Sequence, residues 1–297
     1  MSILILGGTR LVGPHVVKQL VEAGEEVTLY HRGVHEPELP AAARHVHSAD
    51  AGIPILRFPP ELLRPWDAVI HMMPIGEADL HAFAMSFAGK VGRSVVISSG
   101  DVYLAYGRLQ GIEPGPPLPV PLAEDAPKRS VLYPYRKMAK SADEWTFHYE
   151  KILAEVVALG DAGLRATVLR LPKVYGPNDG GHFPLLAATP AEHWNWRWTH
   201  GYVEDVAHAI VLAALKPSAG GVYNVGEAEA LSVAQRLDGW DVRPADEGPA
   251  AHLVKQFDFS QDMVYDTSRI RHDLGYRELV TYEEGMRRTL GTARSPG

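Results

Sequence analysis

The first 24 residues combine an apolar run, a glycine-rich turn and a helical pattern. Residues 2–13 read Ser-Ile-Leu-Ile-Leu-Gly-Gly-Thr-Arg-Leu-Val-Gly, and the chain continues Pro-His-Val-Val-Lys-Gln-Leu-Val-Glu-Ala-Gly. A buried strand, a tight turn and a helix in this order begin a dinucleotide-binding βαβ unit. Glycines let the backbone approach a pyrophosphate, whose charge then lies at the positive end of the helix. The pattern predicts a nicotinamide nucleotide site; the alternative is a strand-to-helix turn that binds no ligand.

Arginines in this unit bear on which nucleotide is bound. Arg10 stands where a regular glycine turn has its middle glycine, and the second strand, residues 26–30, runs into His31 and Arg32 without an acidic residue. A carboxylate at that position would bind the ribose 2′-hydroxyl of NAD. Planar guanidinium groups match phosphate geometry, so NADP is favoured, with NAD as the second choice. The alternative is two solvated arginines. The cofactor contacts predicted from this unit are Gly7, Gly8, Thr9, Arg10, Leu11, Val12, Gly13, His31 and Arg32, with Asp50 after the third strand as a partner for the adenine amino group.

Composition narrows the class of protein. The chain has 297 residues, 46% of them hydrophobic, which is enough for an α/β core with a small second lobe. The formal net charge of -7 argues against nucleic acid as a partner. Without cysteine, the chain has no disulfides and no thiol chemistry, so we expect a cytoplasmic protein. We also expect no membrane span and no signal peptide.

Strand-like and helical patterns alternate along the first half of the chain. Such alternation predicts a parallel sheet covered on both faces, that is, a Rossmann-type doubly wound α/β fold with a small C-terminal substrate lobe. The expected strands are Ile3 to Leu6, Val27 to Tyr30, Ala68 to His71, Ser94 to Ser98 and Ala166 to Leu171, and two expected helices are Val16 to Ala23 and Leu80 to Ala88.

Domain organisation follows from where this alternation loosens. Residues 1–171 are expected to form the dinucleotide-binding domain, to which 199–226 return, and 172–297 mainly the substrate lobe. Residues 106–129 are dense in proline and glycine and are expected to form an active-site flap or a flexible surface loop.

Several segments resemble the extended short-chain dehydrogenase/reductase family, which includes nucleotide-sugar epimerases and dehydratases. The strand end Val-Val-Ile-Ser-Ser-Gly-Asp-Val-Tyr, residues 95–103, resembles the serine strand of that family, and three later segments agree in order and spacing: Leu169 to Pro177, Gly201 to Ala207 and Tyr223 to Gly226. The glycine turn is similar to an atypical branch with Gly-Gly-Thr-Arg. The resemblance implies that Ser99 hydrogen-bonds the reacting oxygen and that further cofactor contacts come from His71, Met72, Ser98, Lys151, Pro172 and Val174.

The catalytic lysine of this family has two candidate positions. A literal Tyr-x-x-x-Lys occurs at Tyr133 and Lys137, where one helical turn would bring phenol and ammonium together. In the family, however, the lysine precedes Ala-Glu and lies about twenty residues before the arginine of the next strand. Lys151 fits this spacing to Arg170, so we favour Lys151, which also implies a contact with the nicotinamide ribose.

The catalytic tyrosine is left open. The position four residues before Lys151 is Phe147, which has no proton to give, and Tyr149 is only two residues away, so on a regular helix it would point elsewhere. Three arrangements are therefore considered. The helix begins irregularly and Tyr149 supplies the phenol, or Tyr133 reaches in from the preceding loop, or no phenol is present and redox chemistry is lost.

Two further features bear on the reaction and its substrate. In the dehydratase branch of the family, an acid at the position of Asp101 acts in elimination, but a dehydratase would have a second acid where this chain has Gly100. Asp101 is thus a candidate catalytic residue, or a residue that caps a turn or orients Ser99. The segment Trp194 to Trp198 is either a stacking surface for a sugar or a strand packed at the sheet edge. The sequence shows no metal-ligand spacing, so no metal is predicted.

Two functional hypotheses follow. The first is an NADP-dependent oxidoreductase or epimerase/dehydratase acting on a small carbonyl or hydroxyl substrate such as a nucleotide sugar, in a monomer or homodimer. The second is a non-catalytic dinucleotide- or RNA-binding protein that keeps the fold. Phe147 favours the second hypothesis, whereas Ser99 and Lys151 favour the first.

Overall fold

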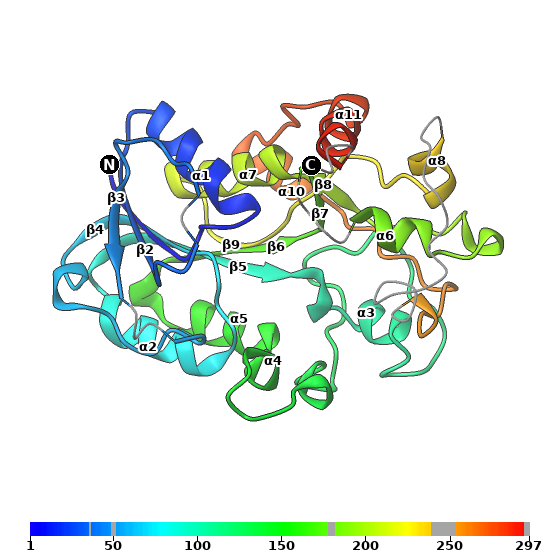
Figure 1. The fold of residues 1–297 in the computed structure, drawn as a ribbon. Coiled ribbons are helices and arrows are strands. Elements are labelled where there is room, and N and C mark those ends of the chain that lie inside the picture. The colour runs from blue at the N-terminus through cyan, green and yellow to red at the C-terminus, as the bar shows by residue number, and fades with distance from the viewer. Residues whose placement is uncertain (36, 49–51, 178–181, 239–253, 294–297) are drawn as a thin grey trace.

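A computed structural model describes residues 1–35, 37–48, 52–177, 182–238 and 254–293. A seven-stranded parallel sheet in the order β3-β2-β1-β4-β5-β6-β9 forms its centre, as Figure 1 shows. The first six strands have the doubly wound order of dinucleotide-binding folds. The strands are β1 (Ser2–Leu6), β2 (Glu26–His31), β3 (Arg44–His47), β4 (Trp66–His71), β5 (Val91–Ser99), β6 (Ala166–Leu171) and β9 (Gly221–Asn224).

Helices cover both faces of this sheet, because the central strands are apolar on both sides. Two hydrophobic clusters result, one on each face. In Figure 1 the upper face carries α1 (Val12–Glu22), α7 (Val203–Leu215), α10 (Ser268–Leu274) and α11 (Tyr282–Ala293). The lower face carries α2 (Glu77–Phe87), α4 (Trp145–His148) and α5 (Lys151–Gly160). The predicted fold class is confirmed.

A third hydrophobic cluster lies beyond the carboxyl ends of β5 and β6. It joins α3 (Leu104–Leu109) to later segments of the chain, among them α6 (His182–Ala187) and α8 (Val233–Leu237). A two-stranded parallel sheet of β7 (Lys173–Tyr175) and β8 (His200–Tyr202) connects this region to the main sheet. The C-terminal helices α10 and α11 pack on the upper face of the main sheet instead, so more of 172–297 returns to that sheet than the sequence analysis expects.

The structure bears on two pairs of alternatives that the sequence left open in this region. Residues 106–129 are not a flap over the site: α3 runs to Leu109, and Leu122 is buried with its amide bonded to the Val264 carbonyl. In the tryptophan segment, Trp196 is buried and donates to the Gln261 carbonyl, which is the packing alternative. Among the described residues, no helix is long and apolar enough to cross a membrane.

Candidate functional site

The glycine turn between β1 and α1 has the backbone that the sequence predicts. Gly7 and Gly8 adopt φ of +83° and +89°, a region that residues with a side chain rarely adopt. A Cβ on Gly13 would lie 2.2 Å from the Gly8 carbonyl oxygen, so only glycine allows the helix to start this close to the turn. The turn therefore presents bare backbone at the N-terminus of an 11-residue helix, which is the arrangement that holds a pyrophosphate.

A cavity of about 920 Å³ runs from this turn to the start of α5. It collects residues from the ends of β1, β2, β5 and β6 and from the segments that follow β4 and precede α5. Most of the predicted cofactor contacts line it: Gly7, Gly8, Thr9, Arg10, Leu11, Val12, His31, Arg32, Met72, Ser98, Lys151, Pro172 and Val174. Sequence reasoning missed Met73 and Ile75 after β4, and Asp143, Glu144 and Trp145 before α5; none of these carries a motif.

Two predicted cofactor contacts among the described residues are not brought to the cavity wall. Gly13 lies behind the turn, where its role is steric. His71 is fully buried behind the wall, and burial, with the nearby Lys151 ammonium, lowers its pKa to about 3, so its imidazole is neutral. Asp50 lies outside the described residues. The sequence order alone could not separate His71 from its neighbour Met72, which does line the cavity.

Lys151 lies at the inner wall of the cavity, with 6% of the residue exposed. Its Nζ donates to the Ile97 carbonyl oxygen at 3.1 Å and to the carbonyl of Pro74. Burial lowers the pKa of the ammonium to about 8, against the opposing effect of nearby carboxylates. Lys151 is therefore held between the carboxyl ends of β4 and β5 as a cation whose proton is lost within an accessible pH range.

A break between α4 and α5 places Tyr149 beside Lys151. α4 ends at His148, and Tyr149 is extended, with φ of −67° and ψ of 113°, before α5 begins at Lys151. The Lys151 Nζ lies 5.4 Å from the centre of the Tyr149 ring, and both residues line the cavity. Phe147 instead lies under the Arg136 guanidinium. The two-residue spacing that would separate these side chains on a regular helix thus brings them together here.

Glu150 fixes this break from the buried side. Its amide donates to the Ile75 carbonyl at 2.8 Å, which ties the break to the segment after β4. Its carboxylate caps α5 by accepting from the Ile152 amide at 2.9 Å and pairs with the buried Arg129 at 3.2 Å. A buried carboxylate without these partners would be destabilising. The hydrogen bonds and the ion pair of Glu150 therefore hold the chain in the broken conformation between α4 and α5.

The Tyr149 hydroxyl donates to Asp101 Oδ2 at 2.8 Å, and the Tyr135 hydroxyl approaches the same oxygen at 3.3 Å. Burial, reinforced by the Asp101 carboxylate, raises the pKa of Tyr149 well above its ordinary value, while hydrogen bonding by Ser99 opposes that rise. Burial also raises the pKa of Asp101, whose Oδ1 has no hydrogen-bond partner among the described residues. The site therefore holds a protonated phenol aimed at a buried carboxyl group, with the Ser99 hydroxyl alongside.

The alternative pair, Tyr133 and Lys137, is not brought to the cavity. The Tyr133 hydroxyl donates to the Glu77 carboxylate at 2.5 Å, and its ring lies under the Arg136 guanidinium. Lys137 is exposed. The one-turn spacing of this pair is not realised either, because Tyr133 has a left-handed φ of 55° and precedes a short 3₁₀ turn.

Comparisons with known proteins bear on the fold and on the segment that contains Tyr149 and Lys151. Residues 134–226, which include Tyr149 and Lys151, match the model of the NAD dependent epimerase/dehydratase family. The uncharacterized protein YbjS of Escherichia coli (strain K12) is 28% identical over 174 residues, which are 45% of this chain and 51% of YbjS. The matched part thus spans about half the length of this curated relative.

Solved structures match almost the whole chain. A UDP-glucose 4-epimerase from Thermotoga maritima, solved with UDP-glucose, is 20% identical with a TM-score of 0.67, covering 99% of both chains. MoeE5, solved in complex with UDP-glucuronic acid and NAD, is 20% identical with a TM-score of 0.66 and covers 99% of both chains. These likenesses establish the fold. Residues 134–226, with Tyr149 and Lys151, are thus similar to the NAD dependent epimerase/dehydratase family, and the whole chain has the fold of these solved structures.

Proposed function

We propose that this protein binds NADP in preference to NAD and transfers hydride and proton to or from a small hydroxyl or carbonyl substrate, such as a nucleotide sugar. The observation that carries the proposal is the meeting of Ser99, Tyr149 and Lys151 in the same cavity as the glycine turn. A bound nicotinamide supplies the acceptor or donor of hydride. The residues present fit a dinucleotide, because the turn offers close backbone approach and a helix N-terminus.

The proton chemistry follows from the hydrogen bonds of Tyr149. In the oxidative direction, the substrate hydroxyl gives its proton to the Tyr149 oxygen while the phenol proton moves to Asp101 Oδ2, which already accepts it as a hydrogen bond. The raised pKa of Asp101 makes that carboxylate a stronger base than an ordinary one. In the reductive direction the same protons return, and Tyr149 protonates the alkoxide. Ser99 holds the reacting oxygen, and the Lys151 ammonium lowers the cost of negative charge on Tyr149.

Nucleotide preference depends on the opposite end of the cavity. Arg10 and Arg32 line it, and the end of β2, Tyr30-His31, carries no carboxylate that would repel a phosphate. A charged hydrogen bond of this kind contributes roughly 1.5–3 kcal/mol, so a lost 2′-phosphate contact should cost about tenfold to a hundredfold in affinity. The known structures carry UDP-sugars, and this chain is proposed to act on that class.

Calorimetric titration of tag-free protein with NADPH and NADH tests the cofactor part of the proposal. The wild type should bind NADPH at least about tenfold more tightly than NADH, and Arg32→Ala should lose most of that preference. Arg277→Ala, which removes an exposed arginine outside the cavity, serves as the matched control. A preference for NADH would overturn the NADP assignment alone. A folded protein that binds neither nucleotide would overturn the proposed function and restore the non-catalytic hypothesis.

Incubation with UDP-glucose or UDP-glucuronic acid tests the substrate part. Each sugar is mixed with enzyme and NADP⁺, nicotinamide absorbance is followed, and the sugar is examined by NMR. A new sugar with no net nicotinamide reduction would indicate transient redox, as in epimerisation, and lasting reduction would indicate a dehydrogenase. Unchanged sugars with a protein that binds NADPH would exclude these two substrates and require a different substrate class.

A further inference from the structure

Three histidines meet at the edge of the main sheet, and no step of the proposed reaction uses them as a group. β2 and β3 run parallel there, and their register pairs His31 with His47. His45 precedes His47 by two residues, so both side chains leave β3 on the same face. Neighbouring strands and a period of two therefore place all three imidazoles on one side of the sheet edge.

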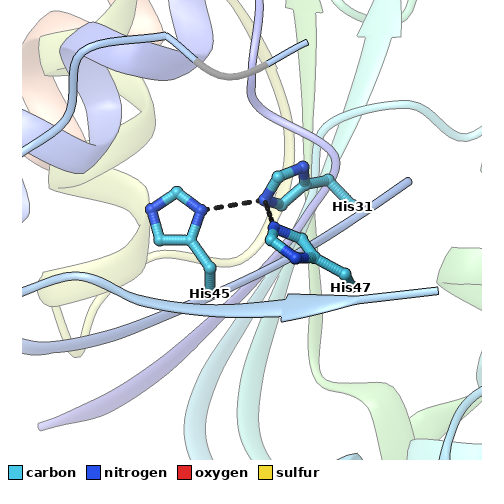
Figure 2. Close-up of side chains that lie close together, drawn as sticks. All are labelled: His31, His45 and His47. Carbon is cyan, nitrogen blue, oxygen red and sulfur yellow. Dashed lines mark hydrogen bonds between the residues drawn. The ribbon is translucent and has the colours of Figure 1, made fainter. Parts of the chain in front are cut away.

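The three rings point toward one another, as Figure 2 shows. His31 Nε2 lies between the other two rings, 2.9 Å from His45 Nδ1 and 3.0 Å from His47 Nε2. One nitrogen from each histidine lies within 4.8 Å of the others. The ring planes of His31 and His47 are nearly perpendicular, at 87°, so the contact is edge-on between nitrogens and not a stacking of faces.

Hydrogen bonding by one proton of His31 does not account well for both of these short nitrogen contacts. The Gly33 amide donates to His31 Nδ1 at 3.2 Å, so a neutral His31 carries its proton on Nε2. That single N–H then faces nitrogens of two other imidazoles at similar distances. One proton cannot make two well-directed hydrogen bonds, whereas one metal ion accepts a lone pair from every nitrogen around it.

We propose that His31 Nε2, His45 Nδ1 and His47 Nε2 bind one divalent ion of the zinc class. Neutral imidazole is a preferred ligand of Zn²⁺, with bonds of about 2.0–2.1 Å in tetrahedral geometry, which places neighbouring nitrogens about 3.4 Å apart. The contacts of 2.9 and 3.0 Å lie a few tenths of an ångström below that value, and the pair of His45 and His47 nitrogens lies within 4.8 Å, so side-chain rotations would bring the three nitrogens to the ion. The fourth position is open to water.

Binding of an ion at this site requires a path from solvent and the loss of one hydrogen bond. His31 is buried, His45 is half-buried and His47 is exposed, so an ion reaches the three nitrogens from the solvent side without unfolding the sheet. Binding through Nε2 leaves the remaining proton of His31 on Nδ1, where it meets the Gly33 amide. That 3.2 Å contact must therefore open. Gly33 follows β2 and has a left-handed φ of +73°, so the opening falls on a turn and leaves the strand pairing in place.

Titration of Zn²⁺ into metal-stripped, tag-free protein without nucleotide tests this site. We expect one equivalent to bind, and Co²⁺ in its place should give the intense visible absorption of a tetrahedral ion. His47→Ala and His45→Ala should each weaken Zn²⁺ binding by at least about tenfold, since even partners of ligands are worth that much. His272→Ala, which removes a histidine with 89% of its side chain exposed, is the matched control and should bind as the wild type does.

The results that support the metal site differ from those that overturn it. Loss of the cobalt absorption in His47→Ala and His45→Ala, with retention in His272→Ala, supports the site. Equal Zn²⁺ affinity in the wild type and the two strand variants would overturn it, as would a wild type that takes up no Zn²⁺. Circular dichroism and nucleotide titration of each variant check the fold and the cofactor cavity, so a failure of metal binding is distinct from a failure of the proposed function.

Discussion

The two ends of the cavity are built in different ways. The end near the glycine turn uses contiguous residues of β1, α1 and β2, so each group is placed by its own strand or turn. The end near Tyr149 is assembled from the carboxyl ends of β4 and β5 and from the break before α5. The first end depends on local backbone, whereas the second depends on contacts between residues 48 to 77 positions apart in the chain. Substitutions at the first should change which nucleotide binds, and those at the second should change what happens to it.

Tyr149→Phe should have the largest effect, because it should reduce turnover while leaving nucleotide binding nearly unchanged. The substitution keeps the ring but removes the hydroxyl that donates to Asp101. We expect turnover to fall by about 10²–10⁴-fold, the contribution of a positioned acid/base group, with the NADPH dissociation constant changed less than about threefold. Steady-state kinetics on a substrate accepted by the wild type, together with calorimetry, measure both quantities.

Tyr135→Phe is the matched control for that substitution. Its hydroxyl approaches the same Asp101 oxygen at 3.3 Å, yet the residue does not line the cavity. Turnover should fall less than about tenfold, because only the environment of Asp101 changes. Equal losses in the two variants would show that Tyr149 acts through Asp101 and not on the substrate, and undiminished turnover in Tyr149→Phe would exclude it as the acid/base.

The same contrast explains what the sequence could and could not predict. β1, α1 and β2 were predictable because an apolar run, glycines and a helical period lie next to one another in the chain. The choice of the proposed catalytic tyrosine stayed open because it depends on a helix break that Glu150 makes with Ile75 and Arg129, residues distant in sequence. Periodicity assumes a continuous helix, and on that assumption Tyr149 and Lys151 diverge.

Short polar edge strands were the other part of the fold that the sequence did not predict. β3 has four residues, Arg44–His47, and its sequence Arg-His-Val-His carries little apolar signal. The histidine cluster depends on the register between β2 and β3, which only the folded sheet supplies. The tryptophan segment left two alternatives for the same reason, since alternation along a strand does not tell which partner covers it. The general lesson is that contiguous motifs are readable, and contacts between short segments are not.

Lys151→Met tests how far the ammonium near Tyr149 contributes to nucleotide binding. The wild-type affinity for NADPH should be full at pH 7 and decline as the pH rises through about 8, because the pKa of Lys151 is lowered to about 8. The variant should bind roughly tenfold more weakly at pH 7 and show no such decline. Calorimetry from pH 6.5 to 9.5 measures both curves.

Stability of the nucleotide-free protein provides a control of opposite sign for Lys151. Between about pH 8 and the ordinary lysine pKa, the unfolded chain holds more protons than the folded one, so the free energy of unfolding rises with pH. Lys151→Met should lack this rise. Parallel pH dependence in wild type and variant would show that another group titrates there.

Asp101→Asn should produce the smallest effect. It tests whether the buried carboxylate near Tyr149 lowers the free energy of unfolding. Burial raises the pKa of Asp101, so the folded state binds its proton more strongly than the unfolded state does. Wild-type stability therefore falls as the pH rises from the ordinary carboxyl pKa toward the raised value, and the amide removes that dependence. The amide oxygen of the variant still accepts from Tyr149, so we expect a gain of about 1 kcal/mol at pH 7, or roughly 2–4 °C in Tm, shrinking toward pH 4. Thermal unfolding at pH 4, 5, 6 and 7 measures it. If Tm depends on pH in the same way in the wild type and in Asp101→Asn, burial of Asp101 does not destabilise the fold. The two ends of the cavity would then differ in how they are assembled but not in their effect on stability.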